Sequence, residues 1–162
     1  MYEVVILNDG VETIINAVSP SPEAPRLPSG TIKQGINTID SFTFEIYPNN
    51  IGYSKINTLT TLVEITNKIT NEKEFRGRVL LPTPKLDSSG KLYTNVICES
   101  ELGYLNDSTT RYGEYHDISV SDFLKVMLDN HNSMVAADKR FELGIVQITG
   151  KLYRFLDYEK TF

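Results

Sequence analysis

The sequence TLVEITNKITNEKEFRGRVLLPTPKLDSSGKLYTNVICESELGYL, residues 61–105, decides the fold because it predicts three successive β-strands. Residues 62–66 form the first strand, and a polar turn at 67–73 leads into the second at 74–81. In the second strand apolar and charged residues alternate, which is the period of two that a half-buried strand shows. Residues 91–100 form the third strand, with apolar residues on both faces for part of its length.

Two prolines and a turn separate the second of these strands from the third. We expect Pro82 and Pro84 to end the second strand, since proline has no backbone N–H to donate to a ladder. The Asp-Ser-Ser-Gly sequence at 87–90 is typical of a turn, with Gly90 supplying a positive φ.

Working outward towards the N-terminus, the chain continues to predict short strands. A hairpin joins 2–7 to 11–17 through Asn-Asp-Gly. A proline-rich loop follows at 20–28, and further strands are expected at 30–36 and 41–47. About seven short strands in the first ~105 residues are typical of a β-sandwich or small β-barrel. We therefore expect residues 1–106 to form one β domain.

Beyond residue 106 the pattern changes from strand to helix. Ser119 can cap a helix, with Asp122 as the acidic partner of a capping box. One apolar stripe then runs along that helix, formed by Val120, Phe123, Leu124, Met127 and Leu128. A strand is expected at 141–148, and 158–162 resembles the first turn of another helix. The predicted fold class is mainly β with one packed α-helix (α+β), and 107–162 is a helix-plus-strand segment that begins a second, incomplete domain.

Composition narrows the class of protein. The 162 residues carry a net charge of −5, from 16 basic and 21 acidic residues, which argues against binding a nucleic-acid backbone. The single cysteine, Cys98, allows no intrachain disulfide and is expected to be a small buried hydrophobe. No apolar run reaches the ~20 residues that span a bilayer. Because the N-terminus lacks a secretory signal peptide, we expect synthesis and folding in a reducing cytoplasm.

No chemical motif stands out in the sequence. His116 and His131 each lack a second histidine at metal-ligand spacing. The sequence contains no Gly-x-Ser-x-Gly and no glycine-rich phosphate loop. Arg76 and Arg78 share a strand face and could bind an anion, although two arginines flanked by Glu74 are more often part of a solvated, salt-bridged sheet surface. We therefore predict no catalytic, cofactor-binding or metal-binding residues and no cofactor.

Several segments, in order and spacing, resemble the N-terminal region of the prophage endopeptidase tail family, also called tail-associated lysins or phage minor structural proteins. The segments are 39–46 (IDSFTFEI), 75–80 (FRGRVL), 98–108 (CESELGYLNDS), 123–143 (FLKVMLDNHNSMVAADKRFEL) and 153–162 (YRFLDYEKTF). The helix followed by His-Asn-Ser and Asp-Lys-Arg-Phe is the most specific of them. The proline-rich loop at 20–28 departs from the family pattern.

The resemblance implies a structural role in a phage or prophage tail. Family members are similar to the hub of the tail tip or baseplate, where three copies form a ring next to the distal tail protein. The implied partners are thus two further copies of the chain, the distal tail protein and the tape-measure protein, with no nucleic acid and no membrane. The implied location is the virion tail tip. Relatives often carry a wall-cleaving domain after this region, and that activity is not expected in these 162 residues.

Two other functions remain open on the sequence alone. Acidic residues are numerous but scattered, so a cell-wall hydrolase that uses two carboxylates is one alternative. A carbohydrate-binding module of a tail tip is the other, with Tyr112 and Tyr115 as candidate sugar-stacking residues.

Overall fold

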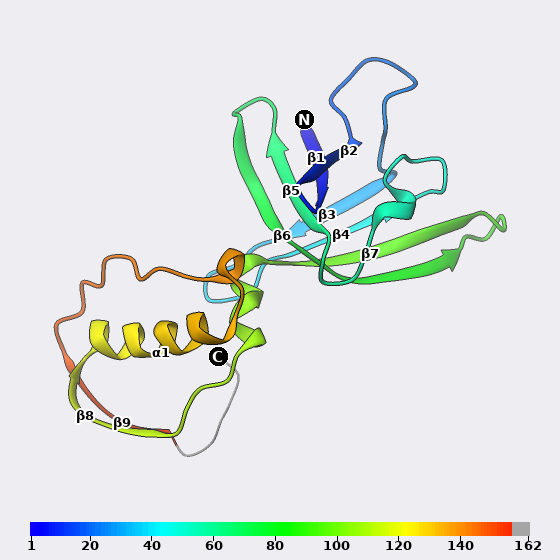
Figure 1. The fold of residues 1–162 in the computed structure, drawn as a ribbon. Coiled ribbons are helices and arrows are strands. Elements are labelled where there is room, and N and C mark those ends of the chain that lie inside the picture. The colour runs from blue at the N-terminus through cyan, green and yellow to red at the C-terminus, as the bar shows by residue number, and fades with distance from the viewer. Residues whose placement is uncertain (157–162) are drawn as a thin grey trace. The chain divides into compact units, whose positions relative to one another are not determined.

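The computed structural model describes residues 1–156 and divides into two compact units, Met1–Leu102 and Gly103–Phe162. The first unit contains a large β-sheet, and the second contains the long helix and a small two-stranded sheet (Figure 1). The helical turn predicted at 158–162 lies outside the described residues. No helix among the described residues is long and apolar enough to cross a membrane.

The first unit is a seven-stranded antiparallel sheet, which confirms the strands that the alternating pattern predicts. Hairpins join β1 to β2, β5 to β6 and β6 to β7, and β4 then pairs with the far side of β7. Across the sheet the order is β2 (Val11–Asn16), β1 (Tyr2–Asn8), β5 (Leu62–Asn67), β6 (Glu72–Leu86), β7 (Leu92–Ser100), β4 (Ser41–Ile46) and β3 (Ser29–Lys33). A short 3₁₀ helix, η1 (Tyr53–Lys55), precedes β5.

The sheet curls around one apolar core but does not close into a barrel. Its two edge strands, β2 and β3, are not hydrogen-bonded to each other, so the ladder stays open. Of the two architectures expected, the structure therefore has the open, sandwich-like one. With one helix in the second unit, the fold class is α+β, as the sequence predicts.

The core of the first unit consists of the side chains that alternate inward along the strands. Phe42 stacks on Phe44 with ring centroids 5.0 Å apart and lies 5.8 Å from the ring of Phe75. The buried core members are Val4, Ile6, Ile15, Phe42, Phe44, Ile46, Val63, Ile65, Phe75, Val79, Val96 and Cys98. Cys98 is thus the buried hydrophobe that the sequence predicts, and burial raises the pKa of its thiol.

The two prolines do not end β6, contrary to the sequence prediction. β6 continues to Leu86, and Pro82 and Pro84 pair with Val96 and Thr94 of β7. The reason is that β5 pairs with β6 only as far as Arg78, so residues 80–86 have a partner on one side only. Every second N–H there points away from β7, and prolines at alternate positions lose no ladder donor. The last part of the β6–β7 hairpin is therefore a projecting arm with one proline-blocked edge (Figure 1).

In the second unit one helix packs on a two-stranded sheet. The strands β8 (Gly113–Ser119) and β9 (Lys151–Leu156) are antiparallel, and α1 spans Val120–Met134. Ser119 caps the helix as predicted: its hydroxyl accepts from the Asp122 backbone N–H at 3.0 Å. The Asp122 carboxylate accepts from that same hydroxyl at 2.7 Å, and not from the Ser119 backbone N–H as in a full capping box. Phe123 of the helix contacts Tyr115 of β8 edge-on, with ring centroids 5.3 Å apart. Two short 3₁₀ helices, η2 (Glu101–Asp107) and η3 (Ala137–Lys139), lie before β8 and after α1.

The strand predicted at 141–148 does not form. Residues 140–150 have no regular secondary structure, and β8 and β9 pair with each other instead of with this segment. Two of its apolar side chains are left exposed, Ile145 by 94% and Ile148 by 64%, whereas Leu143 and Val146 are half-buried. The β-forming pattern is present, but β8 and β9 pair only with each other, and no described strand pairs with this segment.

Candidate functional site

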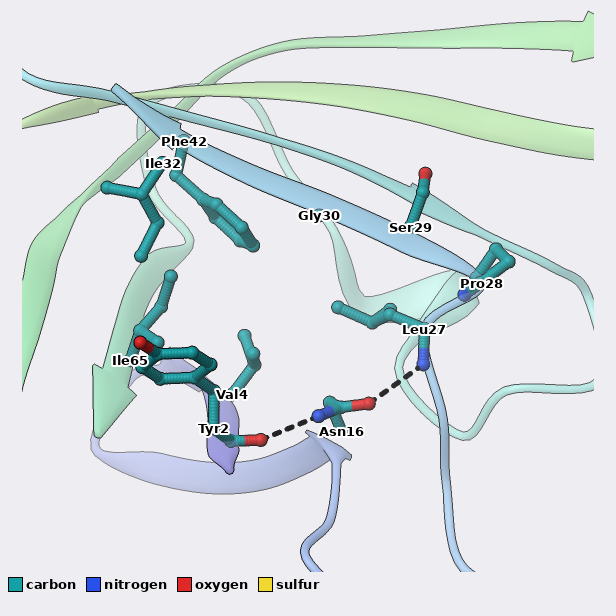
Figure 2. A pocket seen from close by; sticks show the side chains of 10 residues that line it. All are labelled: Tyr2, Val4, Asn16, Leu27, Pro28, Ser29, Gly30, Ile32, Phe42 and Ile65. Carbon is teal, nitrogen blue, oxygen red and sulfur yellow. Dashed lines mark hydrogen bonds between the residues drawn. The ribbon is translucent and has the colours of Figure 1, made fainter. Parts of the chain in front are cut away.

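The two ends of the curled sheet approach each other at a seam, which we define as the gap between β1–β2 and the segment 25–33 that contains β3. The side chain of Asn16 bridges this gap (Figure 2). Its amide nitrogen donates to the backbone carbonyl of Tyr2 at 2.7 Å, and its oxygen accepts from the Leu27 N–H at 3.1 Å. One backbone bond, from Ala17 N–H to the Pro25 carbonyl at 2.9 Å, lies beside it.

Asn50 makes a second bridge at the same seam. Its buried side chain donates from one nitrogen to the backbone carbonyls of Ile15 at 2.8 Å and Arg26 at 3.1 Å. Its oxygen accepts from the Gly52 N–H at 3.0 Å, which holds the amide in place. Two side-chain amides therefore replace the backbone ladder that would close a barrel.

Next to these amides the seam contains an apolar pocket of about 410 Å³. Val4 and Ile65 lie on one side of it and Ile32 and Phe42 on the other, and the Leu27 side chain points into it (Figure 2). The lining is completed by Tyr2, Asn16, Pro28, Ser29 and Gly30. The volume is in the range of small-molecule sites, which begins at about 300 Å³.

The mainly apolar lining of this pocket suits an apolar group. Apart from the Tyr2 phenol, its lining residues carry no ionisable side chain. Acid–base or nucleophilic catalysis needs a positioned proton donor, acceptor or nucleophile, and the hydroxyls in this lining are those of Tyr2 and Ser29. The pocket can instead bury an aliphatic or aromatic group against Ile32, Phe42 and Ile65.

Arg76 and Arg78, the candidate anion site, both pair with carboxylates. The Arg76 Nε lies 3.2 Å from Glu64 Oε1 and 3.1 Å from Glu101 Oε1. Arg78 is buried, with its Nε 2.8 Å and its Nη2 2.7 Å from Glu99 Oε1. The geometry favours the salt-bridged sheet surface over the anion site.

The two histidines lie on different elements and have different roles. His116 is exposed on β8, where its Nε2 lies 2.6 Å from Glu114 Oε1 and its ring contacts Tyr153. His131 is fully buried on α1. Its Nε2 lies 3.1 Å from the Lys139 carbonyl, which can only accept, so Nε2 carries the proton. Its Nδ1 lies 2.7 Å from the Ser108 hydroxyl, which also donates to the Leu105 carbonyl at 3.3 Å.

The Asn-His-Asn sequence at the end of α1 is a structural clamp. Asn130 donates to the Thr109 carbonyl at 2.7 Å, on the same side as the bond from Ser108 to His131. Asn132 exchanges two hydrogen bonds with the backbone of Phe141, at 2.8 and 2.9 Å. These residues tie the helix to the segments before β8 and after η3, which gives the most specific part of the sequence resemblance a physical role.

The remaining candidates are not brought together either. Tyr112 contacts Phe155 and Tyr115 contacts Phe123, so the two tyrosines have different ring partners. Among the described residues no group of three His, Cys, Asp or Glu side chains could hold a metal ion. Sequence reasoning missed Asn16 and Asn50, because an asparagine at a strand end or after Pro48 carries no signal beyond that of a turn.

Comparison with known proteins gives a likeness in structure only. No protein-family model and no curated protein matches the sequence. The fold is similar to that of the 43 kDa tail protein of prophage MuSo2 from Shewanella oneidensis, with a TM-score of 0.52 at 12% identity over 82% of this chain. A tail protein from Neisseria meningitidis MC58 matches 76% of the chain at 16% identity, with a TM-score of 0.49. The chain spans 39% and 32% of the lengths of these two proteins.

Proposed function

We propose that this protein is a structural component of a phage or prophage tail. The observation that carries the proposal is the fold shared with the MuSo2 tail protein over 82% of this chain. Two features of the described residues agree with it. The pocket at the seam is lined mainly by apolar side chains, and Arg78 and His131 are engaged in structural contacts.

Within the tail, the proposed place is the hub of the tail tip or baseplate. The sequence resemblance to the N-terminal region of tail-associated lysins supports this finer assignment. In that role three copies form a ring that contacts the distal tail protein and the tape-measure protein. The chain itself has no catalytic role, and any wall-cleaving activity belongs to other parts of such tails.

The test is the location of the protein in phage particles. Particles induced from the strain that carries the gene are purified, and the protein is sought by mass spectrometry and by immunogold labelling. The proposal expects peptides from this chain in the particles and gold at one end of the tail. It also expects deletion of the gene to give particles with no tails or with defective tails. Absence of the protein from purified, infectious particles would refute it.

A zymogram on purified cell wall distinguishes the proposed role from that of a hydrolase. The purified protein is expected to leave the wall layer intact. Clearing that disappears when a pair of carboxylates such as Glu64 and Glu101 is changed to glutamine would identify a hydrolase instead.

A further inference from the structure

One segment of the second unit has the character of a strand but no partner. Residues 142–149, ELGIVQIT, are rich in β-branched residues, and successive side chains would point to opposite faces if the segment were extended. The structure contains no hydrogen bond from any of these residues to another described residue. Ile145 is 94% exposed and Ile148 is 64% exposed. We call residues 142–149 the donor segment, because they have the composition of a strand but pair with no described strand.

At one edge of the first unit, a strand lacks a hydrogen-bonded neighbour among the described strands. β3 pairs with β4 on one side, and no other described strand pairs with its outer edge. Gly30 and Ile32, the residues of β3 that line the pocket, face the hollow beside that edge (Figure 2). A strand added at this edge would cover the pocket, and its inward side chains would fill it.

We infer that the donor segment of one copy adds to the β3 edge of a second copy and fills the seam pocket. In an antiparallel register with Glu142 opposite Lys33, Leu143 lies opposite Ile32 and Ile145 lies opposite Gly30. The side chains of directly opposite residues share a face, so Leu143 and Ile145 enter the pocket. The Phe42 ring covers Gly30, 3.1 Å from where a Cβ would lie, so the Ile145 side chain would pack against that ring.

Charge complementarity favours this register and a second copy as the occupant. Glu142 and Lys33 are both exposed, and the register places these opposite charges directly across from each other on the outer face. Donor and acceptor lie on different surfaces of the same chain, so the contact is head to tail. Such contacts form a ring when the rotation closes. The inference rests on the proposed function, because it names the surfaces through which copies in a tail ring would meet.

Mixed cysteine variants test the contact directly. Thr31 and Gly144 lie opposite each other in the register, and a Cβ at Gly144 would contact nothing within 4 Å. Thr31→Cys and Gly144→Cys proteins, each with a different tag, are mixed under mild oxidation, and the disulfide-linked heterodimer is quantified. The matched control replaces Gly144→Cys with Ile69→Cys, at a residue that is 77% exposed in the turn between β5 and β6. The native Cys98 is buried and does not react.

The expected result is a heterodimer that forms at least about tenfold faster than in the control pair, as proximity requires. Equal rates in the two mixtures would overturn the inference. A Thr31→Cys/Gly144→Cys double variant that closes its disulfide within single chains at high dilution would also overturn it, because the donor would then belong to the same copy. If the contact fails while the protein is still found in particles, the tail role stands and only the strand addition is lost.

Sedimentation of the intact protein gives an independent measurement. Ile145→Ala is expected to weaken self-association about ten- to a hundredfold, since it removes a buried aliphatic side chain, whereas Ile69→Ala leaves association unchanged. Lys33→Glu and Glu142→Lys should each weaken association up to about fivefold, and the double reversal should restore it. A protein that stays monomeric at every concentration, or an Ile145→Ala variant that associates as the unchanged protein does, would contradict the proposal.

Discussion

Gly77 occupies the place where β6 and β7 approach most closely, and Gly77→Ala tests that approach. A Cβ built on Gly77 overlaps the carbonyl oxygen of Glu99, and lies 2.8 Å from its carbonyl carbon and 2.9 Å from the Ser100 Cα. All three atoms belong to the backbone of the neighbouring strand, so no side chain can turn away. Relief requires the two central strands of the sheet to separate.

The expected cost follows from this geometry. Overpacking a closely packed site costs about 1–3 kcal/mol, and a backbone obstacle places Gly77→Ala at the upper end. Replacing glycine also lowers the entropy of the unfolded chain, which returns about 0.4–1 kcal/mol. The free energy of unfolding should therefore fall by about 2–3 kcal/mol, a large part of the 5–15 kcal/mol typical of a domain.

Urea unfolding followed by circular dichroism measures this change, with Gly90→Ala as the control. Gly90 has a φ of +78° but open space around its Cα, so alanine there meets only the left-handed backbone penalty of about 1–2 kcal/mol, less the same unfolded-state gain. Gly77→Ala should lower the urea midpoint by about 1 M or more and by more than Gly90→Ala does. A Gly77→Ala protein within about 0.5 kcal/mol of the unchanged protein would refute the close packing of β6 on β7.

Three further predictions concern the seam, the helix and the arm. Asn50→Ala removes the bridge to two backbone carbonyls and should lower the free energy of unfolding by about 2 kcal/mol, whereas Asn49→Ala, at an exposed residue, should change it by less than about 0.5 kcal/mol. Ser119→Ala removes the helix cap and should cost about 1 kcal/mol in thermal unfolding, with Ser119→Asp retaining most of that stability. The Ser89 hydroxyl, together with backbone N–H groups, holds the pKa of Asp87 below its ordinary value of 3.8. An NMR titration should therefore show the Asp87 carboxylate titrating below that value. The hydrogen bonds of this carboxylate should cease to stabilise the turn as the pH falls through the folded pKa. Ser89→Ala should raise the pKa of Asp87, and an unchanged titration would contradict the assignment.

The alternating pattern predicts the strands of the first unit well because each strand has one buried and one exposed face. The pattern does not predict the order of the strands in the sheet, because β4 pairs with β7 although β5 and β6 lie between them in the sequence. The two errors have one cause, which is that local sequence does not reveal the partner. β6 continues through Pro82 because its outer side has no partner there, and residues 141–148 remain irregular because β8 pairs with β9 and not with this segment.

The candidate site shows the same limit. The sequence offers no motif for Arg76, Arg78, His116 and His131, and the structure places each of them in separate contacts. The pocket at the seam could not be predicted, because its lining comes from strands distant in sequence. The amides that border it depend on how the sheet curls, which single residues do not encode.

The proline-blocked edge of the arm has a consequence for assembly. A second chain could donate hydrogen bonds to carbonyl oxygens along residues 80–86. It could not accept hydrogen bonds from Pro82 and Pro84, which have no backbone N–H, so a continuous ladder could not form. The arm is therefore protected from the open-ended sheet polymerisation that exposed edges invite. A protein built this way can extend a long hairpin into crowded surroundings without acting as a template for its own precipitation.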